Sequence, residues 1–113
     1  MSQGEYVVGL VSCAGEGEAR SIARHLVEDG IVACVHIMSG ISAIYRWAGS
    51  VEEDVQTLIV VKTLRSAWSQ LVEQVVSMHS DEVPEIIALP IVEGLPSYLA
   101  WIDEVVDVAE SKP

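Results

Sequence analysis

The residues best suited to bind a metal ion lie in a short polar loop. His79 and Glu82 place an imidazole and a carboxylate close together, just before Pro84. Neutral imidazole and carboxylate oxygen both bind divalent transition metals. A closed zinc centre uses about four ligands, and this loop supplies only two. The loop is therefore a candidate metal site, and an ordinary surface loop is the alternative interpretation.

The two cysteines are the next candidates. Cys13 follows a short apolar run and so lies where a strand gives way to a loop, a common place for functional residues. It could be a metal ligand or a nucleophile, but no basic residue lies near it in sequence, so a buried, inert thiol is the alternative. Cys34 begins an apolar stretch, and we expect it to be packed in the core. Because no C-x-x-C spacing is present, we predict two free thiols in a reducing compartment, the cytoplasm.

Two other sets of polar residues give weaker signals. His36 lies between Val35 and Ile37 and would face the opposite side of a strand. We interpret it as a strand histidine with satisfied hydrogen bonds, and metal ligation is the lesser alternative. The acidic residues Glu52 to Asp54 either blunt an exposed strand edge or form an acidic rim around a cation or ligand pocket.

Motifs that would indicate an enzyme are missing from the sequence. There is no glycine-rich phosphate loop, and no Ser-His-Asp pattern has local support. We therefore predict that the protein is not an enzyme. A hydrolase or transferase that uses Cys13 as its nucleophile is an alternative, and so is a scaffold that anchors another protein.

Size and charge narrow the class of protein. The chain has 113 residues and a formal net charge of −11, with 17 acidic against 6 basic residues. This length suits one domain, residues 1–113, with an ordered part from about 6 to 108. A negative field repels phosphate backbones and anionic membrane surfaces, which argues against nucleic acid as a partner. No apolar run approaches the roughly 18 residues of a membrane span, so no membrane insertion is expected.

The chain is organised around the stretch 33–63. Two β-branched, apolar runs flank the short Gly-containing segment 47–50, which predicts a β-hairpin with unusually long arms. Gly40 interrupts the first arm and predicts a bulge there. By simple alternation, Val35 and Ile37 share a face with Tyr45 and Trp47.

The second arm carries a run that is apolar on both faces, Leu58 to Val61. A strand of this kind is covered on both sides, and a chain this small has helices for only one side. We expect another subunit to cover the second side.

The remaining elements follow from periodicity and turn residues. We expect a strand over 6–12, a helix over 16–29, a helix over 66–77 with Ser66 as its N-cap, a strand over 85–90, a helix over 97–108 and a polar, frayed tail over 109–113. With the hairpin, the order is βαββαβ followed by an extra C-terminal helix. This order is the α+β, ferredoxin-like arrangement, in which two helices cover one face of an antiparallel sheet.

Several separate motifs, in the right order along nearly the whole chain, resemble the CutA divalent-cation tolerance family. They are Ala33-Cys34-Val35, Ile44-Tyr45-Arg46-Trp47-Ala48-Gly49, Glu52-Glu53-Asp54, Lys62-Thr63, the segment HSDEVPEIIALP from His79 to Pro90, and Gly94 with Tyr98-Leu99-Ala100-Trp101-Ile102. The resemblance implies a ferredoxin-like subunit in a compact homotrimer, similar in architecture to the PII signalling trimers. It also implies tolerance to divalent metals, with Cu(II) the expected ion and no metal required for folding.

The resemblance also implies where the sites lie. Metal ligation in the family is associated with a cysteine near the end of the first strand and a histidine before the fourth, which correspond here to Cys13 and His79. With Glu82 and Asp81, these complete the predicted set of metal ligands. The family's cleft pattern falls on further residues, namely Tyr45, Trp47, Glu53, Lys62, Glu85, Tyr98 and Trp101.

Three departures from the family pattern affect these expectations. Ser80-Asp81 replaces Pro-Tyr after His79, which removes an aromatic wall and adds a possible oxygen ligand. His36 replaces the family's Asn, and Leu95-Pro96 replaces Asn-Pro. Our leading hypothesis is a homotrimer that binds divalent cations, copper first. The alternative is a PII-like trimer that binds a small organic ligand in clefts between subunits.

Overall fold

Four strands and three α-helices make up residues 5–107, the part of the chain that this computed structural model describes. The elements are β1 (Tyr6–Cys13), α1 (Glu16–Glu28), β2 (Cys34–Trp47), β3 (Ser50–Leu64), a 3₁₀ turn (Arg65–Ala67), α2 (Trp68–Met78), β4 (Ile86–Pro90) and α3 (Pro96–Val105). The predicted end of the ordered part at 108 and the predicted tail at 109–113 lie outside the described residues.

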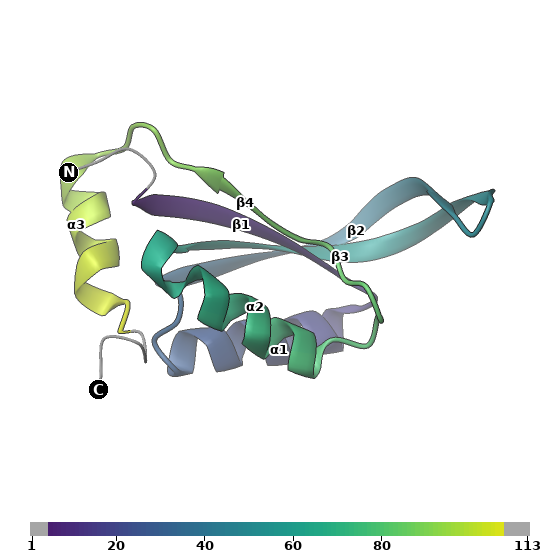
Figure 1. Cartoon of the computed structure of the whole chain (residues 1–113), viewed down its shortest axis with the longest axis horizontal. Coiled ribbons are helices and arrows are strands. Elements are labelled where there is room, and N and C mark those ends of the chain that lie inside the picture. Colours follow the sequence, from purple (N-terminus) through teal and green to yellow (C-terminus); the bar gives the residue numbers. More distant parts are fainter. Residues whose placement is uncertain (1–4, 108–113) are drawn as a thin grey trace.

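The strands form one antiparallel sheet in the order β2-β3-β1-β4. Helices α1 and α2 lie side by side against one face, and α3 lies beyond the end of the sheet that is opposite the hairpin tip (Figure 1). The ferredoxin-like fold predicted from the sequence is confirmed.

The hairpin of β2 and β3 outruns the rest of the sheet, because its strands have 14 and 15 residues whereas β1 has 8 and β4 has 5. Its tip is a tight turn at Ala48 and Gly49, whose φ angles are 52° and 83°. Positive φ at both central residues gives the twist that matches two antiparallel strands. The hairpin accounts for the long dimension of the subunit, 44 Å (Figure 1).

A bulge divides β2 into two halves. Gly40 has a φ of 71°, and the pairing with β3 shifts by one residue between Met38 and Ile41. Beyond the shift Tyr45 pairs with Glu52 on the sheet face away from the helices. The prediction of a bulge at Gly40 is confirmed, but the prediction that Tyr45 and Trp47 share a face with Val35 and Ile37 is wrong, since the extra residue reverses the alternation.

The core lies between the sheet and the two helices. Every second residue of the inner half of β3 is buried, and α1 and α2 supply the facing side chains. The fully buried large side chains include Val11, Ile22, Leu26, Ile59, Val61, Leu71 and Val75. Packing is tight at Gly9, where a Cβ atom would lie 2.7 Å from the Trp68 ring.

The opposite face of the sheet is apolar and only partly covered within the subunit. By strand register it presents Val8, Leu10, Met38, Leu58, Val60, Ile87 and Leu89, all half-buried or exposed. We call these seven residues the open sheet face. It carries the uncovered side of the Leu58 to Val61 run that the sequence pointed to.

Two local predictions were wrong. Ser66 is not the N-cap of α2, because it lies in the 3₁₀ turn that precedes the helix, and Ala67 occupies the cap position. Cys34 is not packed in the core, since it pairs with Lys62 at the end of the open sheet face and is half-buried. His36, by contrast, is exposed while Val35 and Ile37 pack on the core, as expected from alternation.

Candidate metal site

Three segments meet at one end of β1 and bring together a thiol, a carboxylate and an imidazole. Cys13 is the last residue of β1, Glu18 lies in the first turn of α1, and His79 directly follows α2. One ligand atom from each residue lies within 4.8 Å of the others. Because α1 begins only a few residues after β1 ends, its first turn must lie beside Cys13. We call these three residues the metal triad.

The His79 ring is held in one orientation. Its side chain is fully buried, and its Nε2–H donates a hydrogen bond of 2.6 Å to the carbonyl oxygen of Ser12. Its Nδ1 accepts a hydrogen bond of 3.0 Å from the backbone N–H of Asp81. The lone pair is therefore on Nδ1, the nitrogen on the Glu18 side. Histidine ligands of metals commonly donate their second N–H to a backbone carbonyl in this way.

Glu18 contributes an oxygen that no hydrogen bond satisfies. Its Oε2 is buried, has no hydrogen-bond partner among the described residues, and lies 3.5 Å from Nδ1 of His79. A buried carboxylate oxygen without a partner is costly, and a bound cation or a proton removes that cost. The arrangement therefore favours a positively charged ligand between these residues.

Cys13 is buried, with only 1% of its surface exposed. Burial, together with the nearby carboxylates of Glu18 and Asp81, raises the pKa of its thiol to about 11. At neutral pH the thiol holds its proton, so a metal must displace that proton in order to bind the sulfur. The same surroundings argue against Cys13 as a nucleophile.

The structure brings together Cys13 and His79 of the predicted metal ligands, and it adds Glu18. Glu18 was not among the ligands predicted from the sequence, and its place in the first turn of α1 is common for an acidic residue. Its short separation from Cys13 across a tight strand-to-helix connection was the available signal. Asp81 reaches His79 through its backbone N–H, and neither its carboxylate nor that of Glu82 belongs to the metal triad.

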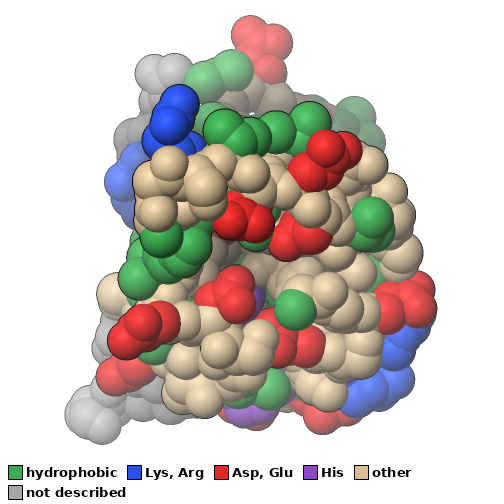
Figure 2. Space-filling view, turned by 90° about the vertical axis from the view of Figure 1, so that its right-hand side faces the viewer, with side chains coloured by type: hydrophobic (Ala, Val, Ile, Leu, Met, Phe, Trp, Pro, Cys, Tyr) green, Lys and Arg blue, Asp and Glu red, His purple; other side chains and the backbone are tan. Residues whose placement is uncertain are grey.

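Asp81 and Glu82 instead border a groove beside the triad, on the other side of the end of β1. The groove has a volume of about 670 Å³. Its lining includes Ser12, Tyr45, Trp47, Gln56, Asp81, Glu82 and Glu85. Figure 2 views the molecule from the hairpin end, where acidic side chains gather around a hollow. The groove is thus acidic, with two aromatic side chains on its hairpin side.

The predicted cleft residues fall into separate groups within one subunit. Tyr45, Trp47 and Glu85 line the groove, whereas Lys62 contacts Cys34. Tyr98 and Trp101 lie on α3, with ring centroids 5.4 Å apart, and Glu53 pairs with Ile44 in the exposed outer hairpin. Along β3, Glu52 opposite Tyr45 and Lys62 are about 33 Å apart, at about 3.3 Å per residue.

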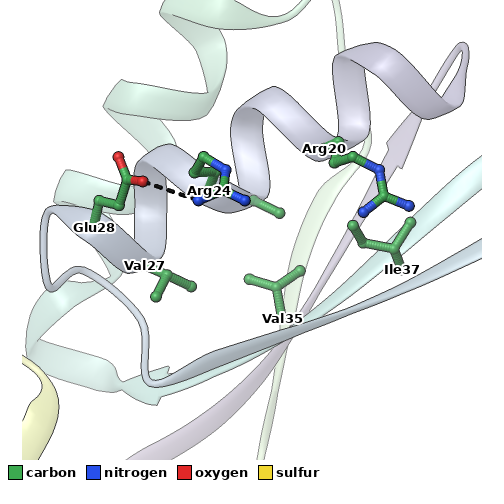
Figure 3. Close-up of a pocket in the computed structure, with 7 residues that line it drawn as sticks. Arg20, Arg24, Val27, Glu28, Val35 and Ile37 are labelled. Atoms are coloured by element: carbon green, nitrogen blue, oxygen red, sulfur yellow. Dashed lines mark hydrogen bonds and ion pairs between the residues drawn. The ribbon is translucent and has the colours of Figure 1, made fainter.

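A second hollow lies between α1 and β2 and contains none of the predicted site residues (Figure 3). It has a volume of about 250 Å³, and its apolar lining is Ala23, Val27, Val35 and Ile37. Arg20 and Arg24 stand at its rim, and Arg24 is paired with Glu28 at 3.2 Å.

Comparison with known protein families shows to which family this chain belongs. The family model described as "CutA1 divalent ion tolerance protein" matches residues 7–105. The chain belongs to the CutA1 family. This result confirms the resemblance seen in the sequence, and with it a general link to divalent-cation tolerance.

Similar CutA1-family proteins share most of their length with this chain. The divalent-cation tolerance protein CutA of Thermus thermophilus is 47% identical over 97 residues, which cover 86% of this chain and 94% of the relative. A solved structure of the Thermus thermophilus protein has a TM-score of 0.88 at 45% identity, covering 90% of this chain and 99% of that one. The periplasmic divalent cation tolerance protein CutA of Archaeoglobus fulgidus has a TM-score of 0.87 at 33% identity, with coverages of 90% and 99%.

Within the described residues, no helix has both the length and the apolar character needed to cross a membrane.

Proposed function

We propose that this CutA1-family chain binds a divalent cation, copper by preference, through the metal triad of Cys13, Glu18 and His79. The observation that carries the proposal is the unpartnered Glu18 Oε2, which is buried 3.5 Å from the lone-pair nitrogen of His79 and beside the Cys13 sulfur. Thiolate, imidazole and carboxylate together suit copper and zinc, and copper ranks highest in intrinsic affinity among the divalent ions. The role is binding rather than catalysis, and the two free thiols favour the cytoplasm.

Calorimetric titration of the protein with Cu(II) at pH 7 tests the site. We expect His79→Ala to weaken binding at least about a hundredfold, because it removes a ligand whose orienting contacts alone are commonly worth about 10- to 100-fold. The matched control is His25→Ala, since His25 lies at the other end of α1 and bonds to Gln74. Unchanged affinity in His79→Ala would rule out the triad as the site.

We further propose that the active form is a homotrimer in which neighbouring subunits cover the open sheet face. The support is apolar surface that a lone subunit leaves in water: Ile87 and Leu89 are 49% and 53% exposed, and Ile44 in the outer hairpin is 67% exposed. Exposed apolar area of this kind on a small domain is typical of an interface.

Sedimentation velocity at micromolar concentration tests the assembly. We expect three times the subunit mass, and we expect Val60→Glu to weaken association, because it places a charge in the centre of the open sheet face. Ser21→Glu adds the same charge to the exposed side of α1 and should leave the mass unchanged. A wild-type monomer with its fold intact would contradict the proposal.

The second candidate function is a PII-like trimer that holds a small organic ligand. It is favoured by the 670 Å³ groove with Tyr45 and Trp47 beside it, a size and lining suited to a small molecule. Because Lys62 and Tyr98 lie far from this groove within one subunit, all the cleft residues could meet only if different subunits contribute them. Native mass spectrometry of freshly purified protein tests this function, and a retained organic mass would support it.

A further inference from the structure

The hollow between α1 and β2 shares no residue with the metal triad or the acidic groove (Figure 3). It opens on the helix side of the sheet, because Val35 and Ile37 pair with the buried Val61 and Ile59 of β3. The open sheet face is on the opposite side, so subunits that cover that face do not cover this hollow. Because β2 is an edge strand, the hollow is also open at the side of the sheet.

The floor of the hollow is apolar. Ala23 and Val27 of α1 face Val35 and Ile37 of β2 across the gap (Figure 3). Val27 is 44% exposed, and Val35 and Ile37 are only half-buried. The volume of about 250 Å³ is below the about 300–1,000 Å³ of sites for drug-sized ligands. The floor therefore suits one short hydrocarbon chain.

The rim of the hollow carries two arginines, Arg20 and Arg24, one turn apart on α1. Glu16, one turn before Arg20, accepts a hydrogen bond of 2.6 Å from Ser39. Among the described residues, Arg20 has no carboxylate partner, although the chain has 17 acidic residues. Arg24 pairs with Glu28, but the two side chains are 76% and 62% exposed, and exposed pairs of this kind are weak. A ligand can therefore use both guanidinium groups.

We propose that this hollow binds a medium-chain aliphatic carboxylate, with the chain on the apolar floor and the carboxylate at Arg20 and Arg24. A guanidinium group matches a carboxylate by donating two parallel hydrogen bonds. Glu28 adds one negative charge at the same rim, which favours a singly charged head group over a phosphate dianion. At 0.15 M salt the Debye length is about 8 Å, so the distant acidic residues oppose binding only weakly.

NMR titration of the intact protein with octanoate in 0.15 M salt tests the proposal, with the methyl signals of Val27, Val35 and Ile37 as the readout. From butyrate to octanoate we expect affinity to rise about fourfold per methylene, which corresponds to about 0.8 kcal/mol for each one buried. Octan-1-ol has the same chain without the charge and should bind at least about tenfold more weakly. Unchanged methyl signals, or equal binding of octanol and octanoate, would overturn the proposal.

Variants of Arg20 test the charge at the rim. Arg20→Gln should lower octanoate affinity about tenfold, whereas Arg20→Lys keeps the charge, loses the paired hydrogen bonds and should have an intermediate affinity. Arg46→Gln is the matched control, because Arg46 is exposed in the outer hairpin. Circular dichroism checks that each variant is folded. Equal affinities of Arg20→Gln and Arg46→Gln would contradict the role of Arg20.

A second copy of the chain is the competing occupant, and sedimentation velocity distinguishes it from a small ligand. If the proposal is correct, Arg20→Glu abolishes octanoate binding and leaves the mass of the assembly unchanged. If a second copy fills the hollow, Arg20→Glu lowers that mass and octanoate leaves the methyl signals of the native protein unchanged. That result would overturn the proposal.

This inference is independent of the proposed metal function, because no residue that lines the hollow belongs to the metal triad. Arg20→Gln should therefore leave Cu(II) affinity unchanged. If copper fails to bind but octanoate shifts the methyl signals, only the metal proposal fails. If copper binds and octanoate does not, only the carboxylate proposal fails.

Discussion

The two cysteines of this chain lie on one sheet and have opposite surroundings. Cys13 pairs with Thr57 of β3 on the helix-covered face, and Cys34 pairs with Lys62 of the same strand on the open face. Along β3 these partners are about 17 Å apart, at about 3.3 Å per residue, so no disulfide can join the two cysteines. One thiol is enclosed with carboxylates, and the other is half-exposed with an ammonium. The chemistry of each sulfur is therefore set by its neighbours.

The strongest test of this comparison is the pH dependence of metal binding. We expect Cu(II) affinity to rise about a hundredfold from pH 6 to pH 8, since each pH unit below the Cys13 pKa of about 11 costs about tenfold in available thiolate. Calorimetry across that range measures it. In Cys13→Ser the dependence should become much shallower, and an equally steep profile there would exclude Cys13 as the ligand.

A substitution at Gly9, in the core on the strand that carries Cys13, should have the next largest effect, a loss of stability. Gly9→Ala would place a Cβ atom 2.7 Å from both the Trp68 ring and Val61 Cγ2, so we expect a loss of about 1–3 kcal/mol in unfolding free energy. Urea denaturation measures it. Gly17→Ala is the matched control, because a Cβ atom at Gly17 meets nothing within 4 Å. Equal stabilities of the two variants would show that β1 and α2 are less closely packed than described.

Removing the negative charge of Glu18 should make the reactivity of Cys13 more like that of Cys34. In Glu18→Gln we expect Cu(II) affinity to fall about tenfold, because an anionic ligand becomes a neutral amide. Iodoacetamide should meanwhile modify Cys13 faster, since the nearby negative charge helps to hold the pKa of this thiol high. Glu16→Gln, on the same turn of α1, is the control. Affinity and reactivity that move in the same direction would contradict a ligand role for Glu18.

The smallest expected effect concerns Tyr98. Cys34→Ala removes the hydrogen bond that is the main cause of the raised pKa of Tyr98, so this pKa should fall toward its ordinary value. NMR titration of the tyrosine ring carbons measures it. The raised pKa of Tyr45, which comes mainly from its hydrogen bond to Asp54, should not move and serves as the internal reference.

Most of the fold could be predicted from the sequence because it depends on local patterns. The apolar, β-branched runs of the hairpin arms, the periodicity of α1 and the Gly-containing turn each specify their element without distant contacts. The sheet face on which Tyr45 and Trp47 lie could not be predicted correctly. A one-residue bulge at Gly40 moves every later side chain of β2 to the opposite face. A glycine suggests a bulge but does not say how the pairing resumes.

The candidate site was less predictable because it depends on three segments meeting. Cys13 and His79 were each candidates from the sequence, and the family resemblance placed them in one site. Their association with Glu18 comes from tertiary structure. Cys34 was assigned to the core because an apolar neighbourhood in sequence does not reveal which sheet face is covered. Both differences arise from contacts made across the fold rather than along the chain.

The lone pair on Nδ1 of His79 already has an occupant, the amide proton of Asp81. A metal ion that binds Nδ1 would break the hydrogen bond from the Asp81 N–H. The freed peptide group belongs to the loop whose Asp81 and Glu82 side chains line the groove. Metal binding at the metal triad would thus change the shape of the groove beside it.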